Sequence, residues 1–310
     1  MQARIRTVGW EADGILSYCL QPLAGECFPA FTAGSHVKID LGEGLARSYS
    51  LLNSPDESNR YEIAVQLDPA SRGGSRRIHD TFRPGQVIDI ACPENFFALR
   101  EDAAHSVLIA GGIGITPLLS MIARLDALGR SWELHYAART RRRAAFLERL
   151  EHRPSVKFYG TDETEGGELD LARVMRAASA GAHFYCCGPE GMIASFKAET
   201  ARVPPAQVHF EYFSADTEAA VDGGYRLELA RSGKCIDVQA GETMLDALLN
   251  AGVNIGFACS EGICGTCRVK VLDGEPDHRD LFLTDAEKAS NESVMVCCSG
   301  ARSRSLVLDL

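Results

Sequence analysis

The spacing of apolar residues changes twice along the chain and divides it into three segments. In the first, residues 1–102, apolar and polar positions alternate over short stretches such as 35–41, 61–67 and 86–91, and turn-forming residues separate these stretches. An alternation with period two places every second side chain on the same face of a β-strand. Many short strands without a strong helical pattern predict a small antiparallel β-barrel.

From residue 103 onward, continuous apolar strands alternate with helical spacing. Residues 106–110 form an apolar run that leads through glycines into a helical pattern, and a second strand at 132–137 precedes a charged helix at about 140–150. The same order of strand, turn and helix then occurs a third time. This alternation predicts a parallel sheet with right-handed crossovers, an α/β domain over residues 103–215.

The last segment, residues 222–310, follows a small acidic linker predicted at 214–222. It opens with two predicted strands at 225–230 and 236–240, and a helical pattern follows at 243–251. A loop rich in cysteine and glycine comes next. The pattern predicts a small domain of mixed α and β structure.

Charge and composition exclude several classes of protein. The chain has 42 acidic against 32 basic residues and a net charge of −10, which disfavours binding to nucleic acids or anionic membranes because both need a basic surface. No apolar run reaches the roughly 18 residues of a membrane helix, and the start of the sequence lacks the pattern of a signal peptide. We therefore expect a cytoplasmic protein with no nucleic-acid and no membrane partner.

The cysteines of the last segment carry the most specific chemical signal. The chain has 11 cysteines, an odd number that cannot pair completely, and in a reducing compartment clustered cysteines indicate a metal or iron–sulfur centre. Cys259, Cys264 and Cys267 lie close together with glycines between them, and Cys297 follows at the distance of a plant-type [2Fe–2S] ligand pattern. A zinc site is the alternative interpretation, but a structural zinc site generally uses two short cysteine hairpins, and this segment has one such hairpin. Cys298 is the alternative fourth ligand, although the spacing favours Cys297.

This loop and its surroundings resemble the ferredoxin domain of the phthalate dioxygenase reductase family. The likeness rests on residues 258–267, 274–280 and 296–299. The family includes the reductase subunits of vanillate demethylase and of related Rieske oxygenases. The resemblance extends over the whole chain, and it implies a flavin barrel, a nucleotide-binding α/β domain and a plant-type ferredoxin domain with the β-grasp fold.

Two motifs of the first segment are similar to the flavin site of ferredoxin reductase-like barrels. In the first, at residues 47–50, an arginine can hold a phosphate, an aromatic ring can pack beside the flavin, and a serine hydroxyl can hydrogen-bond near the flavin N5. In the second, at residues 72–75, a turn of backbone N–H groups can bind a phosphate. Each motif alone is more often structural, but their order along the chain favours a flavin. The resemblance implies FMN rather than FAD and assigns to it Arg47, Ser48, Tyr49, Ser50, Val65, Gln66, Arg72, Gly73, Gly74 and Ser75, with Ser50 in a catalytic position.

The nucleotide motif follows the first strand of the second segment and opens a helix. Glycines there let a pyrophosphate approach the backbone at the helix N-terminus. The motif departs from the strict Gly-x-Gly-x-x-Gly pattern, but it resembles the form found in ferredoxin reductase-like NAD(P) domains. Cys187 resembles the start of a second hallmark of those domains, near the nicotinamide ring; a buried thiol at a strand end is the alternative. The resemblance assigns to the nucleotide Gly111, Gly112, Gly114, Thr116, Pro117, Arg139, Cys187, Gly188 and Pro189.

The choice between NADH and NADPH depends on a group of arginines. Arg139 and the arginines at 141–143 follow a predicted strand, where arginines can bind the 2′-phosphate of NADPH. A solvated helix face explains the same charges, and the resembling reductases use NADH, so we expect NADH. Phe213 matches the aromatic residue that lies close to the flavin in the family; it has that role or is a core aromatic residue between domains.

These observations predict an electron-transfer oxidoreductase of three modules, with the FMN barrel at 1–102, the NAD domain at 103–215 and the ferredoxin domain at 222–310. Hydride passes from NADH to FMN, which releases electrons singly to the [2Fe–2S] cluster. The resemblance implies that the acceptor is the oxygenase component of a Rieske-type demethylase or ring-hydroxylating system. The alternatives are a reductase of a P450 or a diiron monooxygenase, and an iron–sulfur redox sensor without turnover.

Acidic residues that follow the cysteine loop predict a partner surface. We expect Asp273, Glu275, Asp277 and Asp280 to be surface charges that steer a basic region of the oxygenase toward the cluster. Ordinary solvated loop charges are the alternative.

Overall fold

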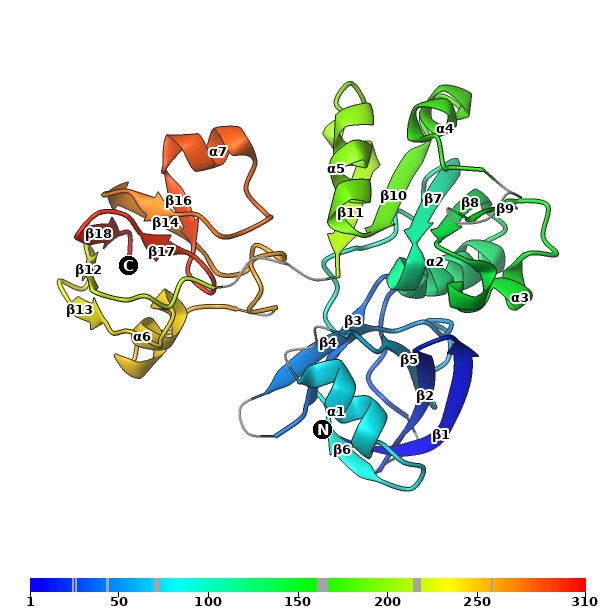
Figure 1. The fold of residues 1–310 in the computed structure, drawn as a ribbon, viewed down its shortest axis with the longest axis horizontal. Helices are drawn as coiled ribbons and strands as arrows, with labels where there is room; N and C mark the ends of the chain where they lie inside the picture. Colours follow the sequence, from blue (N-terminus) through cyan, green and yellow to red (C-terminus); the bar gives the residue numbers. More distant parts are fainter. Residues whose placement is uncertain are drawn as a thin grey trace. The chain divides into compact units, whose positions relative to one another are not determined.

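The computed structural model of the chain divides into two compact units, Met1–Phe213 and Ser214–Leu310 (Figure 1). None of the helices in the described part of the chain is long and apolar enough to cross a membrane. The structure describes residues 1–23, 25, 27–42, 45–69, 73–160, 167–213, 219–257 and 259–310.

The first unit begins with the predicted antiparallel barrel. One sheet has the order β5-β2-β1-β6, and β3 and β4 form a separate pair. The Ile39–Ile90 bridge joins β3 to the chain after β6, and the Leu52 N–H donates to the Glu62 carbonyl at 2.9 Å, so the two sheets close on each other. The strands are β1 (Gln2–Ala12), β2 (Ile15–Pro22), β3 (His36–Asp40), β4 (Ala46–Ser50), β5 (Tyr61–Gln66) and β6 (Val87–Asp89).

A helix lies where the sequence pattern predicts only a turn. The helix α1 (Gly74–Thr81) begins after Gly73, whose φ of 95° is left-handed. Ile78 is the one apolar side chain among its buried residues, which explains why hydrophobic periodicity does not reveal it. His79 Nε2 donates to the Val65 carbonyl at 2.9 Å and ties the helix to β5.

The α/β part of the first unit has a five-stranded parallel sheet in the order β11-β10-β7-β8-β9, with α2, α4 and α5 beside it (Figure 1). The charged helix predicted at 140–150 is wrong: Phe146 has a φ of 61°, which a right-handed helix does not accept, and it separates a short turn from a four-residue helix. The elements are β7 (His105–Gly111), η1 (Gly112–Gly114), α2 (Ile115–Ala127), β8 (Ser131–Ala138), η2 (Arg141–Arg143), α3 (Leu147–Leu150), β9 (Val156–Gly160), α4 (Leu171–Ala177), β10 (His183–Gly188), α5 (Glu190–Glu199), η3 (Pro205–Gln207) and β11 (Val208–Tyr212).

The barrel and the α/β part share one hydrophobic core. Ile15 and Leu52 of the barrel belong to the same buried cluster as Leu118 and Met121 of α2. A buried hydrogen bond from the Gly34 N–H to the Ser120 hydroxyl, 3.1 Å long, joins the same surfaces. The two modules therefore pack as one body, and the domain boundary at 102/103 stays a prediction.

The second unit is a mixed sheet with a helix packed on it. Its order is β13-β12-β18-β14-β16; β12 and β18 are parallel and the other pairs are antiparallel. Thr243 and Asp246 form a capping box that starts α6, whose Met244 and Leu248 are fully buried in the core of the unit. The elements are β12 (Tyr225–Leu229), β13 (Cys235–Val238), α6 (Met244–Asn250), β14 (Arg268–Asp273), β15 (Pro276–Asp277), α7 (Asp285–Ser290), β16 (Ser293–Met295), β17 (Gly300–Ala301) and β18 (Ser305–Leu308).

Candidate functional site

The predicted flavin motifs meet where β4 passes the start of α1. A Cβ atom added to Gly74 would lie 2.8 Å from Cγ and 3.1 Å from Nε of Arg47, so the arginine stem lies directly against the first turn of the helix. The first N–H groups of a helix have no partner within the helix and attract anions. The Arg47 guanidinium and these N–H groups together can bind the phosphate of FMN. The absence of a side chain at Gly74 leaves the space that this arrangement needs.

The other predicted flavin residues lie on the strands next to this point. Because side chains alternate along β4, Arg47 and Tyr49 share one side, and Ser48 and Ser50 share the other. Tyr49 packs against the barrel core, whereas Ser50 is buried opposite His36 of β3. At the end of β5, Val65 is buried and Gln66 is exposed; near the start of α1 the Ser75 hydroxyl accepts the Asp68 N–H at 3.1 Å. Arg72 lies outside the described residues.

The two predicted nucleotide motifs come into contact at the centre of the parallel sheet. The connection after β7 runs to β8 and the connection after β10 runs in the opposite direction to β11, and open α/β sheets bind ligands at the carboxyl ends of strands at such a switch point. A Cβ atom on Gly114 would lie 2.1 Å from the Cys187 carbonyl oxygen, and one on Gly111 would lie 2.6 Å from Cδ of Pro189. The structure therefore brings both motifs to one place.

The glycines of this motif differ in what they make room for. The sequence predicts that Gly111, Gly112 and Gly114 all make room for a pyrophosphate. In the structure, Gly111 and Gly114 instead lie against the end of the neighbouring strand β10. Gly112 has a φ of 54°, and no described atom lies within 4 Å of its Cβ position, so this glycine faces open space. Thr116 and Pro117 are buried in the first turn of α2, and the Thr116 hydroxyl donates to the Ile113 carbonyl at 3.0 Å.

Cys187 lies inside the core rather than on an open surface. It is 0% exposed, and burial raises the pKa of its thiol well above the usual value. Glu211 is its register partner on β11. Oε2 of Glu211 is buried and has no hydrogen-bond partner among the described residues, and burial raises the Glu211 pKa to about 8. Phe213 is partly buried against the same hydrophobic cluster.

The sequence of residues 211–213 resembles the Glu-x-Phe end of this domain in the family, but sequence reasoning assigned a role to Phe213 alone and none to Glu211. Its raised pKa gives a prediction for stability. The folded chain keeps the Glu211 proton up to pH about 8, whereas the unfolded chain releases it near 4.5. Since the unfolded state then binds fewer protons, stability falls as pH rises through this window, by about 1.4 kcal/mol per pH unit.

We therefore expect Glu211→Gln to unfold at a higher temperature than the wild type at pH about 8 and to lose this advantage toward pH about 5. Thermal unfolding of the first unit across this range measures the difference. Glu199→Gln, on the exposed side of α5, is the matched control and should follow the wild type. Parallel curves for Glu211→Gln and the wild type would contradict the prediction.

Arg139 is exposed just beyond the carboxyl end of β8. Among the arginines that follow it, Arg141 pairs with Glu151 and its guanidinium lies 5.3 Å from the centre of the Phe158 ring. Arg141 is thus engaged within the fold, whereas the part of Arg139 in nucleotide binding stays a prediction.

The four predicted cluster ligands gather in the second unit. The Cys259 thiol interacts with those of Cys264 and Cys297, and Cys267 interacts with Cys297. Interaction with Cys259 raises the Cys264 pKa above its usual range. In the part of the chain that the structure describes, no group of three or more His, Cys, Asp or Glu surrounds a position for a single ion. Four neighbouring thiols are the donor set of a [2Fe–2S] cluster.

The loop around these thiols has the backbone that cluster binding needs. Gly262 and Gly265 have φ values of 71° and 76°, and Ser260 is also left-handed at 57°. The Glu261 N–H donates to Cys259 Sγ at 3.3 Å, as expected for backbone groups that stabilise a charged sulfur. Cys298 instead points at Gly262, where an added Cβ would lie 2.5 Å from its sulfur. This arrangement favours Cys297 as the fourth ligand.

The predicted acidic partner surface is wrong for one of its four members. Asp280 is buried with 1% of its surface exposed. Glu275 pairs with Arg302 at 3.5 Å, and Asp277 pairs with Arg302 at 3.4 Å and with Arg279 at 2.7 Å. Glu275 and Asp277 are thus paired with arginines and Asp273 is exposed, and the steering role of these three residues stays a prediction.

Comparisons with known proteins agree with this geometry. Residues 227–302 match the 2Fe-2S iron-sulfur cluster binding domain, and residues 93–204 match the N-terminal domain of dimethylamine monooxygenase subunit DmmA-like proteins. The chain is 48% identical over 308 residues to phenoxybenzoate dioxygenase subunit beta of Ectopseudomonas oleovorans, which covers 99% of this chain and 96% of the relative. It is 42% identical over 306 residues to vanillate O-demethylase oxidoreductase of Pseudomonas sp. (strain HR199 / DSM 7063), with 96% of both chains covered.

The solved structure of phthalate dioxygenase reductase, described as modular for electron transfer from pyridine nucleotides to [2Fe-2S], matches 100% of this chain and 98% of its own with a TM-score of 0.81 and 36% identity. The chain belongs to the phthalate dioxygenase reductase family. Membership confirms the predicted fold class and the prediction of an oxidoreductase that serves an oxygenase system. The predicted cofactors, FMN, a pyridine nucleotide and a [2Fe–2S] cluster, agree with the family.

Proposed function

We propose that this chain passes electrons from NADH through FMN and a [2Fe–2S] cluster to a Rieske-type oxygenase component. The observation that carries the proposal is the gathering of four thiols in one unit of a chain whose other unit joins a flavin-type barrel to a nucleotide-type sheet. When bound, FMN takes up a hydride from NADH and releases single electrons, which the cluster accepts one at a time.

The protein's own part is to hold these groups. Arg47 and the first turn of α1, with Gly73, Gly74 and Ser75, hold the FMN phosphate. Tyr49, on the same side of β4 as Arg47, is assigned to the flavin ring, and Ser50 is assigned to the flavin N5. Gly112 admits the pyrophosphate of NADH at the start of α2, with Gly188 and Pro189 on the opposite side of the switch point. Phe213 packs near the flavin. The cluster ligands are Cys259, Cys264, Cys267 and Cys297.

We place the reaction in the cytoplasm. None of the eleven cysteines forms a disulfide in the structure, and a reducing compartment keeps cysteines available as cluster ligands. We also propose NADH as the preferred donor, since the arginines beyond β8 are partly used within the fold. Replacing Arg139 should change the ratio of the activity with NADH to the activity with NADPH, because an arginine at this strand end can bind the 2′-phosphate.

Reconstitution with purified oxygenase components tests the proposed function. The purified chain should show flavin and [2Fe–2S] absorbance, reduce cytochrome c with NADH, and support substrate turnover only with a Rieske oxygenase. Turnover with a P450 or a diiron monooxygenase in place of the Rieske component would assign a different partner. A chain that binds the cofactors but reduces no acceptor would be a redox sensor.

The contact between Arg47 and Gly74 gives a prediction for FMN. Arg47→Ala removes the guanidinium beside the helix N-terminus, and a hydrogen bond to a charged partner contributes about 1.5–3 kcal/mol, so we expect FMN to bind roughly 10- to 100-fold more weakly. Equilibrium dialysis of the chain freed of flavin measures this. Arg76→Ala removes an exposed arginine of the same helix and should retain FMN normally. Equal losses in both variants would show a general charge effect rather than a site.

A further inference from the structure

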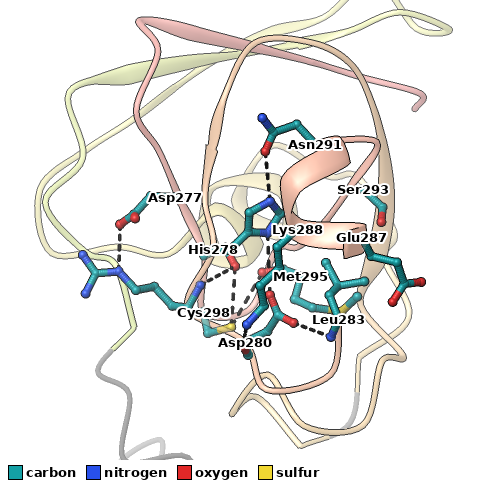
Figure 2. Close-up of polar contacts among 12 residues, drawn as sticks. Asp277, His278, Asp280, Leu283, Glu287, Lys288, Asn291, Ser293, Met295 and Cys298 are labelled. Carbon is teal, nitrogen blue, oxygen red and sulfur yellow. Dashed lines mark hydrogen bonds and ion pairs between the residues drawn. The ribbon is translucent and has the colours of Figure 1, made fainter. Parts of the chain in front are cut away.

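Asp280 is a buried carboxylate that the electron-transfer scheme does not use. Its side chain is 0% exposed, in a chain segment whose neighbouring acids lie at the surface. Figure 2 shows it beneath the helix α7, with polar groups from several segments turned toward it. Oδ2 accepts the Leu283 N–H at 2.7 Å, and Lys288 Nζ donates to the Asp280 backbone carbonyl at 2.5 Å.

Asp280 and the two residues after it pack against the cysteine loop and hold it in place. A Cβ atom on Gly262 would lie 3.0 Å from Cα and 3.1 Å from Cβ of Asp280, so this residue is in direct contact with the loop between Cys259 and Cys264. The next residue, Leu281, donates its N–H to the Gly262 carbonyl at 3.1 Å. The Phe282 ring covers Gly265 in the same way, 2.4 Å from its Cβ position.

A histidine completes the surroundings of the carboxylate. His278 Nδ1 lies 3.7 Å from Asp280 Oδ1, and its Nε2 donates to Asn291 Oδ1 at 3.2 Å (Figure 2). Neither His278 Nδ1 nor Asp280 Oδ1 has a hydrogen-bond partner among the described residues. Burying an aspartate costs free energy unless it is hydrogen-bonded and compensated, and packing alone would be served by an apolar residue at this position.

We propose that Asp280 is a positioning residue of the iron–sulfur site that fastens the cysteine loop and places a fixed negative charge beside it, which lowers the reduction potential of the cluster. The inference rests on the proposed function in that it takes the four cysteines as ligands. Reduction adds one electron to the cluster, and a buried carboxylate disfavours that added charge because the surrounding protein screens it poorly. Net charge and hydrogen bonding around the sulfurs are the factors by which proteins set such potentials.

The test compares Asp280→Asn with Asp273→Asn in the full chain with its cofactors bound. Asparagine keeps the size of the side chain and an oxygen that accepts the Leu283 N–H, and its NH₂ group would face His278 Nδ1, so this variant removes mainly the charge. Asp273 is an exposed carboxylate of β14 in the same unit and serves as the matched control. The reduction potential of the cluster is measured by redox titration, with the electron paramagnetic resonance signal of the reduced cluster as the readout.

We expect the Asp280→Asn cluster to be reduced more easily, with a tenfold shift of the one-electron equilibrium, equivalent to about 59 mV. Asp273→Asn should match the wild type because solvent and salt screen an exposed charge. A potential in Asp280→Asn that is unchanged or lower, with the cluster absorbance intact, would overturn the proposal. Absence of a [2Fe–2S] spectrum from the wild type would instead reject the proposed function itself.

If Asp280→Asn loses its cluster while the rest of the chain stays folded, the loss supports the positioning role, and a second variant decides the effect of charge. Lys288→Met keeps the carboxylate but removes the ammonium group that binds the Asp280 backbone carbonyl, so the potential should fall. Lys270→Met, on the exposed side of β14, is the control for this variant. A potential in Lys288→Met equal to that of the control would show that charges at this place do not act on the cluster.

Discussion

Replacing Cys264 with serine is expected to abolish the reduction of cytochrome c by NADH and to leave the bleaching of the flavin by NADH intact. Cys264 interacts with Cys259 in the second unit, whereas the residues that we assign to FMN and NADH belong to the first. A serine hydroxyl is a poor substitute for a thiolate ligand, so the cluster would be lost or disabled while hydride transfer continues. Stopped-flow absorbance of the flavin and steady-state cytochrome c reduction separate the two half-reactions.

The matched control is Cys235→Ser, because Cys235 is an exposed cysteine on β13 of the same unit. This variant should keep both half-reactions at wild-type rates. If Cys264→Ser is folded and yet fails to bleach its flavin, the linear order from NADH to FMN to cluster is wrong.

The second large effect is expected at Gly114. A methyl group there would stand 2.1 Å from the Cys187 carbonyl oxygen, a backbone atom that cannot turn aside. Gly114→Ala must therefore push η1, which directly follows β7, away from the end of β10, and overpacking of this kind costs about 1–3 kcal/mol of stability. Because the same strand ends form the proposed nucleotide site, we expect flavin reduction by NADH to slow by at least about tenfold, which corresponds to 1.4 kcal/mol.

Gly191→Ala provides the comparison in the same domain, since no described atom lies within 4 Å of a Cβ placed on Gly191 in α5. Its melting temperature and its rate of flavin reduction should equal or slightly exceed those of the wild type. A Gly114→Ala protein that keeps both its melting temperature and its rate would show that the two strand ends can separate without cost.

The sequence predicts most of this fold because the relevant signals are local. Alternation over 61–67 and the apolar run at 106–110 correspond to β5 and β7, and Thr243 caps α6 as its position before an apolar stretch suggests. The sequence pattern did not predict the helix α1, because Ile78 is the one apolar side chain among its buried residues. The segment at 140–150 contains good helix formers, but the left-handed backbone at Phe146 overrides their propensity.

In the candidate site, too, the sequence revealed the residues of a known pattern but not the contacts between separate segments. Cys259, Cys264 and Cys267 are close in sequence, and the known distance of the ligand pattern to Cys297 identified the four thiols that the structure brings together. The burial of Asp280 depends on contact with Gly262, eighteen positions earlier, and no pattern within the acidic run reveals it. Likewise, the sequence pattern suggests that Gly111 and Gly114 make room for a phosphate. It cannot reveal their contact with the end of β10, because that contact exists only after the parallel sheet has formed.

The central place of β18 in the second sheet bears on how the protein matures. Residues 305–308 insert between β12 and β14, and the fourth thiol, Cys297, also comes late in synthesis. The sheet of the ferredoxin unit therefore cannot close until residues 305–308 have been synthesised, whereas the strands of the first unit are complete by Tyr212 and domains generally fold in the order of their synthesis. We expect iron delivery to be the last maturation step, and cells short of iron to accumulate a folded, flavin-loaded chain that can oxidise NADH without serving its oxygenase.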